Sequence, residues 1–377
     1  MRQKGYEINM KYRKFGNFAS VSPLGFGTMR LPEKNGRVDR EKTSELLHTA
    51  IDCGVNYIDT AYFYHGGESE EAVGEALSNG YREKTMLATK APLSAIKTAD
   101  DFDRIFDIQM NRLKTDFLDC YLLHAVSGER WENTVKPLRL VEKMHRLRES
   151  GAVKHIGFSF HGSLEDFKRV ADEYEGCEFC QIQLNYIDVN NQAGLEGLRY
   201  AAQKGMGVII MEPLLGGKLA NLHENVRKAL VADKTDVEAA LDFLWDKSEV
   251  SFLLSGMNSM QQLKDNLVYA GRSNVNMLSE KEKDRYIAAK AAYDNRSSVA
   301  CTGCRYCMPC PAGIDIPALF STVNEGLNKT FFAALEDYKN IPVRADACKA
   351  CGACEKKCPQ GLPVRSIMKE INQKFGE

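Results

Sequence analysis

The chain has 377 residues, 44% of them hydrophobic, and a formal net charge of -1 at pH 7. A chain of this length can bury one large core and still form a smaller second domain. Its nearly neutral charge gives no support for binding to nucleic acids or to anionic membranes. We find no signal-peptide pattern and no long apolar run, and we therefore expect a soluble, cytoplasmic protein.

Residues 1–9 are expected to form an N-terminal extension ahead of a hairpin that begins at Met10. From residue 25 onward, short apolar runs alternate with amphipathic stretches, which is typical of repeated βα units. The predicted strands are Leu24–Gly27, Asn56–Asp59, Thr85–Thr89, Phe117–Leu123, His155–Ser159, Phe179–Leu184, Gly207–Met211 and Phe252–Ser255. The helical patterns between them include Arg40–Cys53, Glu68–Leu77, Phe102–Leu113, Pro137–Glu149, Leu164–Tyr174 and Val237–Trp245.

Eight strands with intervening helices over residues 10–278 predict an α/β fold, a (β/α)8 or TIM barrel. A doubly wound dinucleotide-binding sheet is the alternative, and it would need a Gly-x-Gly-x-x-Gly turn after its first strand. Here Gly25 and Gly27 are followed by Met29 and Arg30, so that fingerprint is absent. In a barrel, functional residues gather where the strands end.

A carboxylate, a phenol, an amine and an imidazole lie at or just after predicted strand ends: Asp59, Tyr62 or Tyr64, Lys90 and His124. A phenol is a weak acid at neutral pH, but a neighbouring ammonium stabilises the phenolate and lowers its pKa. We expect Asp59 to hold Lys90 charged and oriented, the phenol to transfer a proton, and His124 to position a carbonyl oxygen or relay the proton. Any one of these residues alone would more simply be a satisfied buried polar group. Their combination on one rim favours catalysis.

At these residues the chain resembles the aldo/keto reductase superfamily, whose Asp-Thr-Ala-x-x-Tyr, Thr-Lys and Leu-His elements supply such a tetrad. The spacing selects Tyr64 rather than Tyr62. The resemblance covers about residues 10–275. It implies reduction of a small carbonyl, or oxidation of an alcohol, with NADP or NAD as cofactor and Tyr64 as general acid or base.

The same resemblance implies contacts to the nicotinamide, pyrophosphate and adenine groups of the cofactor. The implied residues are Gly27, Thr28, Ser159, Gln181, Pro213, Leu214, Gly216, Gly217, Ser255, Gly256, Asn258, Gln262 and Asn266. Two departures from the family pattern stand out. Phe160 and His161 occupy the place of an Asn that contacts the nicotinamide amide, and Met257 precedes Asn258 where a basic residue often binds the 2′-phosphate. The choice between NAD and NADP therefore stays open, with Lys264 a substitute cation.

Residues 279–299 are rich in Lys, Glu, Asp and Ala and are expected to form an exposed connecting helix. Eight of the 12 cysteines follow, in a predicted small domain over residues 300–377. Its segment Cys310–Pro317 resembles helical ferredoxins, and the resemblance implies a helical ferredoxin-like domain. Within it, Ile316–Tyr338 has the apolar spacing of a helix, and we expect it to wrap the metal sites.

The cysteines form two runs of four, Cys301, Cys304, Cys307 and Cys310, and Cys348, Cys351, Cys354 and Cys358. Such runs predict two [4Fe-4S] clusters in which the last cysteine of each run crosses to the other cluster. One cluster would use Cys301, Cys304, Cys307 and Cys358, and the other Cys310, Cys348, Cys351 and Cys354. The second run has the bacterial ferredoxin spacing, and the first is one residue shorter before its Cys-Pro, which leaves its ligand geometry open.

Zinc and disulfides are the alternative roles for these cysteines. Zinc sites pair Cys-x2-Cys motifs across a longer loop, and these uninterrupted runs of four fit that pattern poorly. Disulfides are not expected, because the four cysteines outside the runs lie in ordinary apolar surroundings. Cys177 and Cys180 form a lone Cys-x2-Cys pair that we interpret as packing.

A hydride carries two electrons, whereas each cluster passes one, so the two halves do not couple directly without an intermediary such as a flavin. We find no flavin signature. The clusters would then exchange electrons with a ferredoxin, a flavoprotein or another redox partner, or would be structural. An alternative function is an electron-transfer or regulatory subunit whose barrel binds nucleotide. No pattern indicates the substrate or the oligomeric state.

Overall fold

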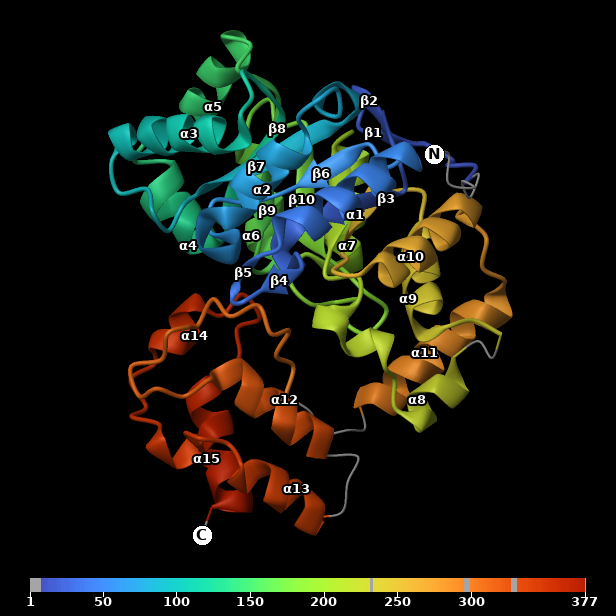
Figure 1. Cartoon of the computed structure of the whole chain (residues 1–377), viewed down its shortest axis with the longest axis vertical. Helices are drawn as coiled ribbons and strands as arrows, with labels where there is room; N and C mark the ends of the chain where they lie inside the picture. Colours follow the sequence, from blue (N-terminus) through green and yellow to red (C-terminus); the bar gives the residue numbers. More distant parts are fainter. Residues whose placement is uncertain (1–7, 231–232, 295–298, 327–330, 377) are drawn as a thin grey trace. The chain divides into compact units, whose positions relative to one another are not determined.

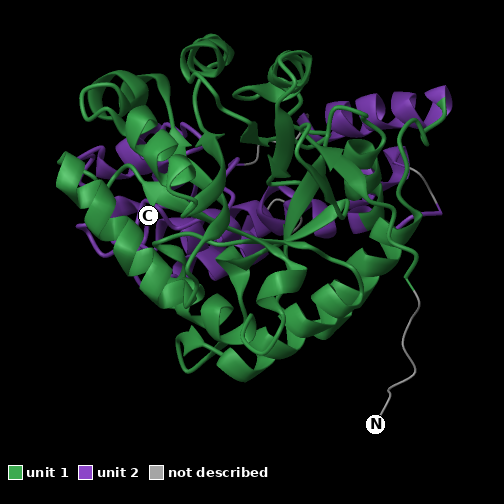
Figure 2. Ribbon diagram, turned by 90° about the horizontal axis from the view of Figure 1, so that it is seen from above, with its two compact units in different colours: residues 1–213, 238–279 green, residues 214–237, 280–377 purple. Residues whose placement is uncertain are grey.

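The structure is a computed structural model that describes residues 8–230, 233–294, 299–326 and 331–376 (Figure 1). Most of the predicted N-terminal extension, residues 1–7, therefore lies outside the described residues. The chain divides into two compact units, residues 1–213 with 238–279 and residues 214–237 with 280–377 (Figure 2). Nothing in the sequence had indicated that residues 214–237, which follow a barrel strand, would group with the C-terminal unit.

The first unit is built around a closed barrel of parallel strands, as predicted. The strands follow one another around the barrel in the order β10-β11-β12-β3-β6-β7-β8-β9. They are β3 (Leu24–Gly27), β6 (Tyr57–Asp59), β7 (Met86–Pro92), β8 (Leu118–Val126), β9 (Val153–Phe160), β10 (Phe179–Gln183), β11 (Gly207–Met211) and β12 (Phe252–Gly256). Each lies within three residues of its predicted bounds. The strands that extend furthest beyond the prediction are β7 and β8, so Lys90 and His124 lie inside strands and not after them.

Helices follow the strands along the chain and surround the barrel (Figure 1). They are α1 (Arg40–Asp52), α2 (Glu68–Ala76), α3 (Ala99–Leu113), α4 (Gly128–Arg130), α5 (Leu140–Glu149), α6 (Leu164–Glu173), α7 (Gly194–Gln203), α9 (Asp236–Trp245) and α10 (Met260–Arg272). Side-chain caps fix several of their N-termini. Thr98 and Asp101 form a capping box on α3, and Ser259 caps α10 by accepting from the Gln262 amide.

A hairpin of β1 (Arg13–Phe15) and β2 (Ala19–Val21) precedes the barrel, as expected from the sequence. Phe15 is fully buried in a cluster with Tyr57, Phe179 and Phe252, which lie at or near the starts of barrel strands. A Cβ atom on Gly207, the first residue of β11, would lie 2.4 Å from the Phe15 ring. The hairpin therefore closes the N-terminal end of the barrel, opposite to the strand ends that carry the predicted tetrad.

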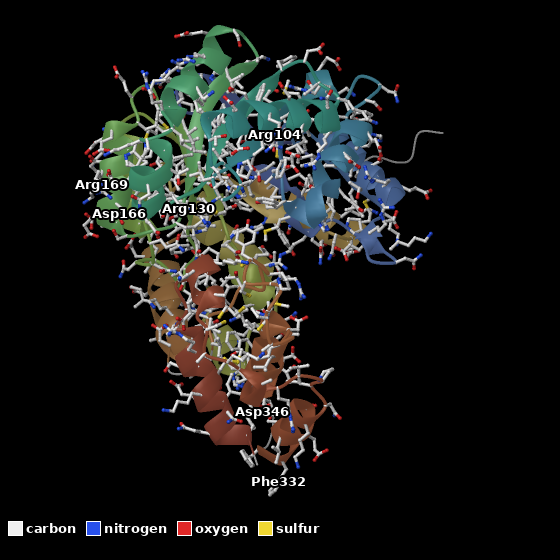
Figure 3. The ribbon with its side chains drawn as sticks, turned by 90° about the vertical axis from the view of Figure 1, so that its left-hand side faces the viewer. Arg104, Arg130, Asp166, Arg169, Phe332 and Asp346 are labelled. Carbon is white, nitrogen blue, oxygen red and sulfur yellow. The ribbon has the colours of Figure 1, made fainter. Side chains whose placement is uncertain are left out.

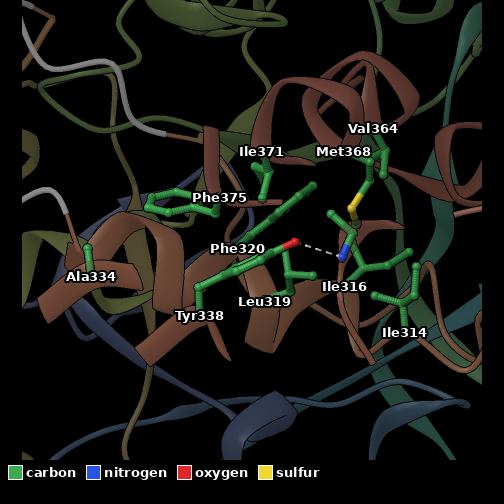
Figure 4. Close-up of a cluster of buried hydrophobic side chains, with 11 residues drawn as sticks. Ile314, Ile316, Leu319, Phe320, Ala334, Tyr338, Val364, Met368, Ile371 and Phe375 are labelled. Carbon is green, nitrogen blue, oxygen red and sulfur yellow. Dashed lines mark hydrogen bonds between the residues drawn. The ribbon is translucent and has the colours of Figure 1, made fainter. Parts of the chain in front are cut away.

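The second unit is helical. Its described helices are α8 (Glu224–Ala229), α11 (Glu280–Asp294), α12 (Ile316–Gly326), α13 (Phe331–Lys339), α14 (Ala353–Lys357) and α15 (Val364–Phe375). Its core gathers Phe320, Tyr338, Met368 and Phe375 from α12, α13 and α15 (Figure 4). The Tyr338 hydroxyl accepts a hydrogen bond from the Ala345 amide at 3.2 Å, so the core's one phenol is paired there.

Two predictions about this unit need correction. The segment Ile316–Tyr338 holds two helices, α12 and α13, and not one continuous helix; Leu327, one of the apolar positions used to predict it, lies outside the described residues. The connecting helix α11 is not exposed on all sides, because Tyr286 and Ala289 are buried. None of the described helices has the length and apolar character needed to cross a bilayer.

Candidate active site and cluster ligands

Lys90 is the centre of the predicted tetrad. It is fully buried on β7, and its Nζ donates to Asp59 Oδ1 at 2.6 Å and to the Thr60 carbonyl at 2.7 Å. Asp59 ends β6, the strand that pairs with β7, so the barrel register brings the two charges together. Burial raises the pKa of Asp59, and the Lys90 ammonium opposes that rise.

Tyr64 lies beside this ion pair. Its ring centroid is 5.0 Å from Lys90 Nζ, and the side chain is 9% exposed, which leaves a narrow approach for a ligand. The His124 ring packs edge-on against the Tyr64 ring, with centroids 6.1 Å apart. The structure thus brings Asp59, Lys90, Tyr64 and His124 together.

His124 is half-buried, and its pKa lies well below its usual value of 6.5. Burial is the largest cause, followed by the positive charge of Lys90 and by His161 and Arg130. The imidazole is therefore neutral at pH 7 and can donate one hydrogen bond and accept another.

A bulge in β8 sets the direction of His124. The pairing of β8 with β9 shifts register between Leu123 and Val126, and Ala125 has a φ of 55°. The Ala125 amide donates to Ser159 Oγ at 2.7 Å, and Arg130 Nη1 donates to the Ala125 carbonyl at 2.8 Å. Figure 3 shows Arg130 on the same side of the barrel unit as Asp166 of α6. Bulges commonly re-aim side chains at active sites. This bulge is held by Ser159 at the Ala125 amide and by Arg130 at the Ala125 carbonyl.

Sequence analysis missed Glu70, which is fully buried on α2 behind Lys90. Its Oε1 accepts from Thr89 Oγ1 at 2.7 Å and from Gln109 Nε2 at 2.6 Å, while Arg112 pairs with its other oxygen at 3.1 Å. Gln109 Nε2 also lies 3.1 Å from the Lys90 carbonyl. This network holds the β7 backbone that carries Lys90. No sequence signal separates Glu70 from the exposed glutamates of the same helix.

Thr28 and Ser159, two of the predicted cofactor residues, use their side chains for hydrogen bonds near the tetrad. Thr28 Oγ1 donates to the Asp59 carbonyl at 2.9 Å, and Ser159 accepts from Ala125 as described. Gln181 differs. It is 3% exposed, its Nε2 contacts Met211 Sδ at 3.7 Å, and its Oε1 has no hydrogen-bond partner among the described residues. A buried acceptor without a partner is a suitable contact for the amide of a bound nicotinamide.

His161 belongs to a second polar network. Its Nδ1 lies 3.1 Å from Gln192 Oε1, Gln192 Nε2 donates to Gln183 Oε1 at 3.2 Å, and Gln183 Nε2 donates to Asp188 at 3.1 Å. Burial lowers the pKa of His161 to about 4. The residue that departs from the family pattern is thus neutral and hydrogen-bonded.

The predicted adenine segment lies at the start of α10. Asn266 Nδ2 donates to Ser255 Oγ at 3.1 Å, and both side chains are buried. Gln262 Oε1 accepts from the Asn258 amide at 3.0 Å. Gly27 and Gly256 are paired neighbours in β3 and β12. These contacts connect the end of β12 with the first turns of α10, and Lys264 is exposed on the same helix.

Pro213 ends one segment of the first unit, and Leu214, Gly216 and Gly217 belong to the second. The Gly217 amide donates to the Leu214 carbonyl at 2.9 Å. A Cβ atom on Gly216 would lie 2.2 Å from the carbonyl oxygen of Thr302, whereas one on Gly217 would meet nothing within 4 Å. Gly216 was predicted to let phosphate approach the backbone; in the structure the chain beside Cys301 approaches it, and Gly217 is the open position.

Three cysteines of the second run and two of the first line a cavity. Cys310, Cys348, Cys351 and Cys354 line it, together with Cys307. Apolar residues complete the wall, namely Pro311, Ala312, Ile314, Ile316, Val364 and Met368. Among the described residues, no three His, Cys, Asp or Glu side chains converge closely enough to hold a single metal ion. Thiols around an apolar cavity have the chemistry of an iron–sulfur cluster site.

The other cysteines of the two runs gather at Cys307. Its pKa is raised to about 12, first by burial and then by the nearby sulfurs of Cys304, Cys301 and Cys358. Cys358 follows the second run in sequence yet lies close enough to act on a residue of the first. Elsewhere, burial raises the pKa of Cys177 and Cys180, and Cys177 Sγ contacts the Phe179 carbonyl at 3.3 Å, as packing residues do.

Comparison with known proteins gives two domain matches. The profile of the aldo/keto reductase family matches residues 23–283, and that of the 4Fe-4S dicluster domain matches residues 300–362. Among curated relatives, 6-dehydroglucose reductase of Novosphingobium aromaticivorans is 29% identical over 60% of this chain and 76% of its own. Uncharacterized oxidoreductase YqkF of Bacillus subtilis is 28% identical over 72% of this chain and 94% of its own.

Solved structures agree with the fold. An aldo-keto reductase of Bacillus halodurans in its holo form superposes with a TM-score of 0.64 at 24% identity, covering 74% of this chain and 96% of its own. An aldo-keto reductase of Klebsiella pneumoniae in complex with NADPH gives a TM-score of 0.60 at 25% identity, covering 74% and 94%. The chain is therefore an oxidoreductase that belongs to the aldo/keto reductase family and carries a C-terminal 4Fe-4S dicluster domain.

Proposed function

We propose that the barrel catalyses nicotinamide-dependent reduction of a small carbonyl, or the reverse oxidation of an alcohol, with Tyr64 as the general acid or base. The observation that carries this proposal is the buried Lys90 ammonium, 2.6 Å from Asp59 Oδ1 and 5.0 Å from the centre of the Tyr64 ring. Burying a cation costs desolvation free energy. Because this cation lies beside a phenol whose ionisation it can stabilise, we interpret it as catalytic.

The residues divide the proton chemistry among them. Tyr64 gives its hydroxyl proton to the substrate oxygen during reduction and recovers it in the reverse direction. Lys90 stabilises the phenolate that forms, and Asp59 keeps Lys90 charged and oriented. His124, neutral and fixed by the bulge at Ala125, hydrogen-bonds the substrate oxygen. The nicotinamide, when bound, supplies or accepts the hydride.

We infer that NADP or NAD binds along the strand ends, with Gln181 at the nicotinamide amide. The NADPH complex of the Klebsiella pneumoniae relative supports NADP. The NADH-specific methylglyoxal reductase of Escherichia coli, 26% identical over 53% of this chain, supports NAD. Met257 and Asn258 offer no cation for a 2′-phosphate, so the candidate basic side chains are Lys264 and Arg30, which lies against Gly256. A direct comparison of NADPH and NADH affinities decides between them.

We also propose two [4Fe-4S] clusters, one held by Cys301, Cys304, Cys307 and Cys358 and the other by Cys310, Cys348, Cys351 and Cys354. The shared cavity of Cys310 with the second run and the proximity of Cys358 to Cys307 support this crossed arrangement. Bound clusters would each supply one electron at a time. Because their ligands must stay reduced, we place the protein in the cytoplasm.

Anaerobic titration of the purified protein with NADPH and NADH, in the presence of a panel of small aldehydes and ketones, tests the proposal. Nicotinamide oxidation that depends on the carbonyl and disappears in Tyr64→Phe is the expected result. Nucleotide binding without turnover of any carbonyl would favour the alternative, an electron-transfer or regulatory subunit. Bleaching of the visible cluster absorbance during the titration reports whether electrons reach the C-terminal unit.

A further inference from the structure

The two cysteine runs differ in charge. Residues 348–370 contain five Lys and Arg residues and two Glu residues, in a chain whose overall net charge is -1. The first run, residues 301–315, holds one cation and one carboxylate. Those two, Arg305 and Asp315, pair with each other at 2.9 Å. Of the two segments, the one that holds the second run therefore has an excess of positive charge and the one that holds the first run has none.

The cations of the second run reach the candidate cluster cavity itself. Lys349 and Arg365 line the cavity, and both are exposed. Cys351, which lines it too, is the only exposed cysteine among those described. Arg365 is held by Glu355, whose oxygens lie 2.8 Å from Nε and 2.7 Å from Nη2. A cluster bound there would be reached from solvent past Cys351, through a rim of positive charge.

Two more cations extend this rim. Lys356 and Lys357 are exposed in the last turn of α14, the short helix that follows Cys351. Within the described part of the chain, neither they nor Lys349 form an ion pair, and Lys349, Lys356, Lys357 and Arg365 together define a basic rim. Unpaired surface cations are free to meet an oppositely charged partner.

Compensation of the clusters' own negative charge does not account for the rim. A cluster on the first run would carry the same thiolates and the same charge. Around the first run, Arg305 is paired with Asp315 and Lys218 donates to the Val299 carbonyl, so both of these cations already have a partner. Within the described residues Lys349, Lys356 and Lys357 form no ion pair, so their charge is available to a molecule that approaches the second cavity.

We propose that the basic rim is the docking surface for an acidic redox protein that exchanges single electrons with this chain. The proposal rests on the cluster assigned above to Cys310, Cys348, Cys351 and Cys354. No covalent bond would form in the exchange: the docked partner would be oxidised by one electron, and a cluster held by Cys310, Cys348, Cys351 and Cys354 would accept that electron. Weak, charge-steered complexes of small area suit such transfers.

The test uses the full-length protein, purified anaerobically with its iron, and a flavodoxin as the acidic probe. Binding is measured by calorimetry at about 0.01 M and about 0.15 M salt, where the screening length falls from about 30 Å to about 8 Å. We expect the dissociation constant to rise about tenfold or more with salt. We expect a similar loss at low salt in the double variant Lys356→Glu/Lys357→Glu.

A matched control, Lys281→Glu/Lys283→Glu, changes the charge equally on exposed positions of α11 in the same unit and should leave the dissociation constant within about twofold. Iron content and the electron paramagnetic resonance signals of all variants should equal those of the wild type. Normal cluster signals with absent, salt-independent or control-like binding would overturn the docking surface alone. Missing cluster signals in the wild type would overturn the proposed clusters. Equal binding of a short DNA duplex would also refute it, by showing a general polyanion site.

Discussion

Separating the buried ion pair of Asp59 and Lys90 should be costly for stability as well as for catalysis. At 2.6 Å and an effective dielectric constant of about 20, their attraction is about 6 kcal/mol. Desolvation offsets most of this in the intact pair, but removal of one partner leaves the other charge buried alone. We expect Lys90→Met and Asp59→Asn each to lower the free energy of unfolding of the barrel by about 3–5 kcal/mol at pH 7.

The double variant Asp59→Asn/Lys90→Met should lose clearly less than the sum of the two single losses, because neither charge then remains. Urea unfolding followed by tryptophan fluorescence measures all four corners of the cycle. Lys264→Met, at an exposed position, serves as the control and should cost less than about 0.5 kcal/mol.

The free energy of unfolding of the Lys90→Met variant should also depend on pH. Burial already raises the pKa of Asp59 above its ordinary 3.8 in the wild type, and loss of the ammonium removes the interaction that lowers it. At pH values above 3.8, Asp59 of the folded variant therefore binds more protons than Asp59 of the unfolded chain. The stability of the variant must then fall as pH rises and recover as pH falls. Single losses below about 1 kcal/mol, strict additivity in the cycle, or no recovery in acid would refute the reasoning.

Three further outcomes are expected. Tyr64→Phe should lower kcat for carbonyl reduction by about 10²–10⁴-fold in steady-state kinetics. Its nucleotide affinity, measured by fluorescence titration, should stay within about twofold of the wild type. A retained kcat would exclude Tyr64 as the acid. Gly217→Ala should cost only the backbone strain of its φ of 95°, about 1–2 kcal/mol, because its Cβ would meet nothing within 4 Å. Gly216→Ala, at a φ of 67° and with its Cβ 2.2 Å from the Thr302 carbonyl oxygen, should destabilise the second unit by about 1–3 kcal/mol more than Gly217→Ala and reduce iron retention. Because the pKa of His161 falls from 6.5 in the unfolded chain to about 4 in the folded one, stability should decline as pH falls through that interval, and His161→Asn should reduce the decline in acid unfolding curves.

The barrel could be predicted because its signals are local. Each strand is a short apolar run between turns, and Gly207–Met211 was predicted to the residue. The positions of Asp59 and Lys90 next to each other also followed from sequence, because neighbouring parallel strands end on the same face. What the pattern could not give is the bulge at Ala125, since a register shift depends on the pairing partner and not on the strand's own residues.

Glu70 shows a second limit. Its sequence neighbourhood, Glu68–Glu71, looks like the exposed acidic first turn of a helix, and only tertiary contacts with Thr89 and Gln109 bury it. The division of Ile316–Tyr338 into α12 and α13 is a similar case, because the apolar spacing runs through both helices and does not mark where the first one ends. A sequence pattern thus predicts which face of an element is buried, while the contacts and ends of that element depend on tertiary packing.

Residues 214–237 follow strand β11 in the sequence, carry the proposed cofactor glycines, and belong to the unit that holds the cysteine runs. Within that unit, Gly216 abuts Thr302, the residue after Cys301, and Lys218 Nζ donates to the Val299 carbonyl at 2.5 Å. A cluster bound by Cys301 would therefore stabilise the loop that carries Gly216 and Lys218 within the same unit.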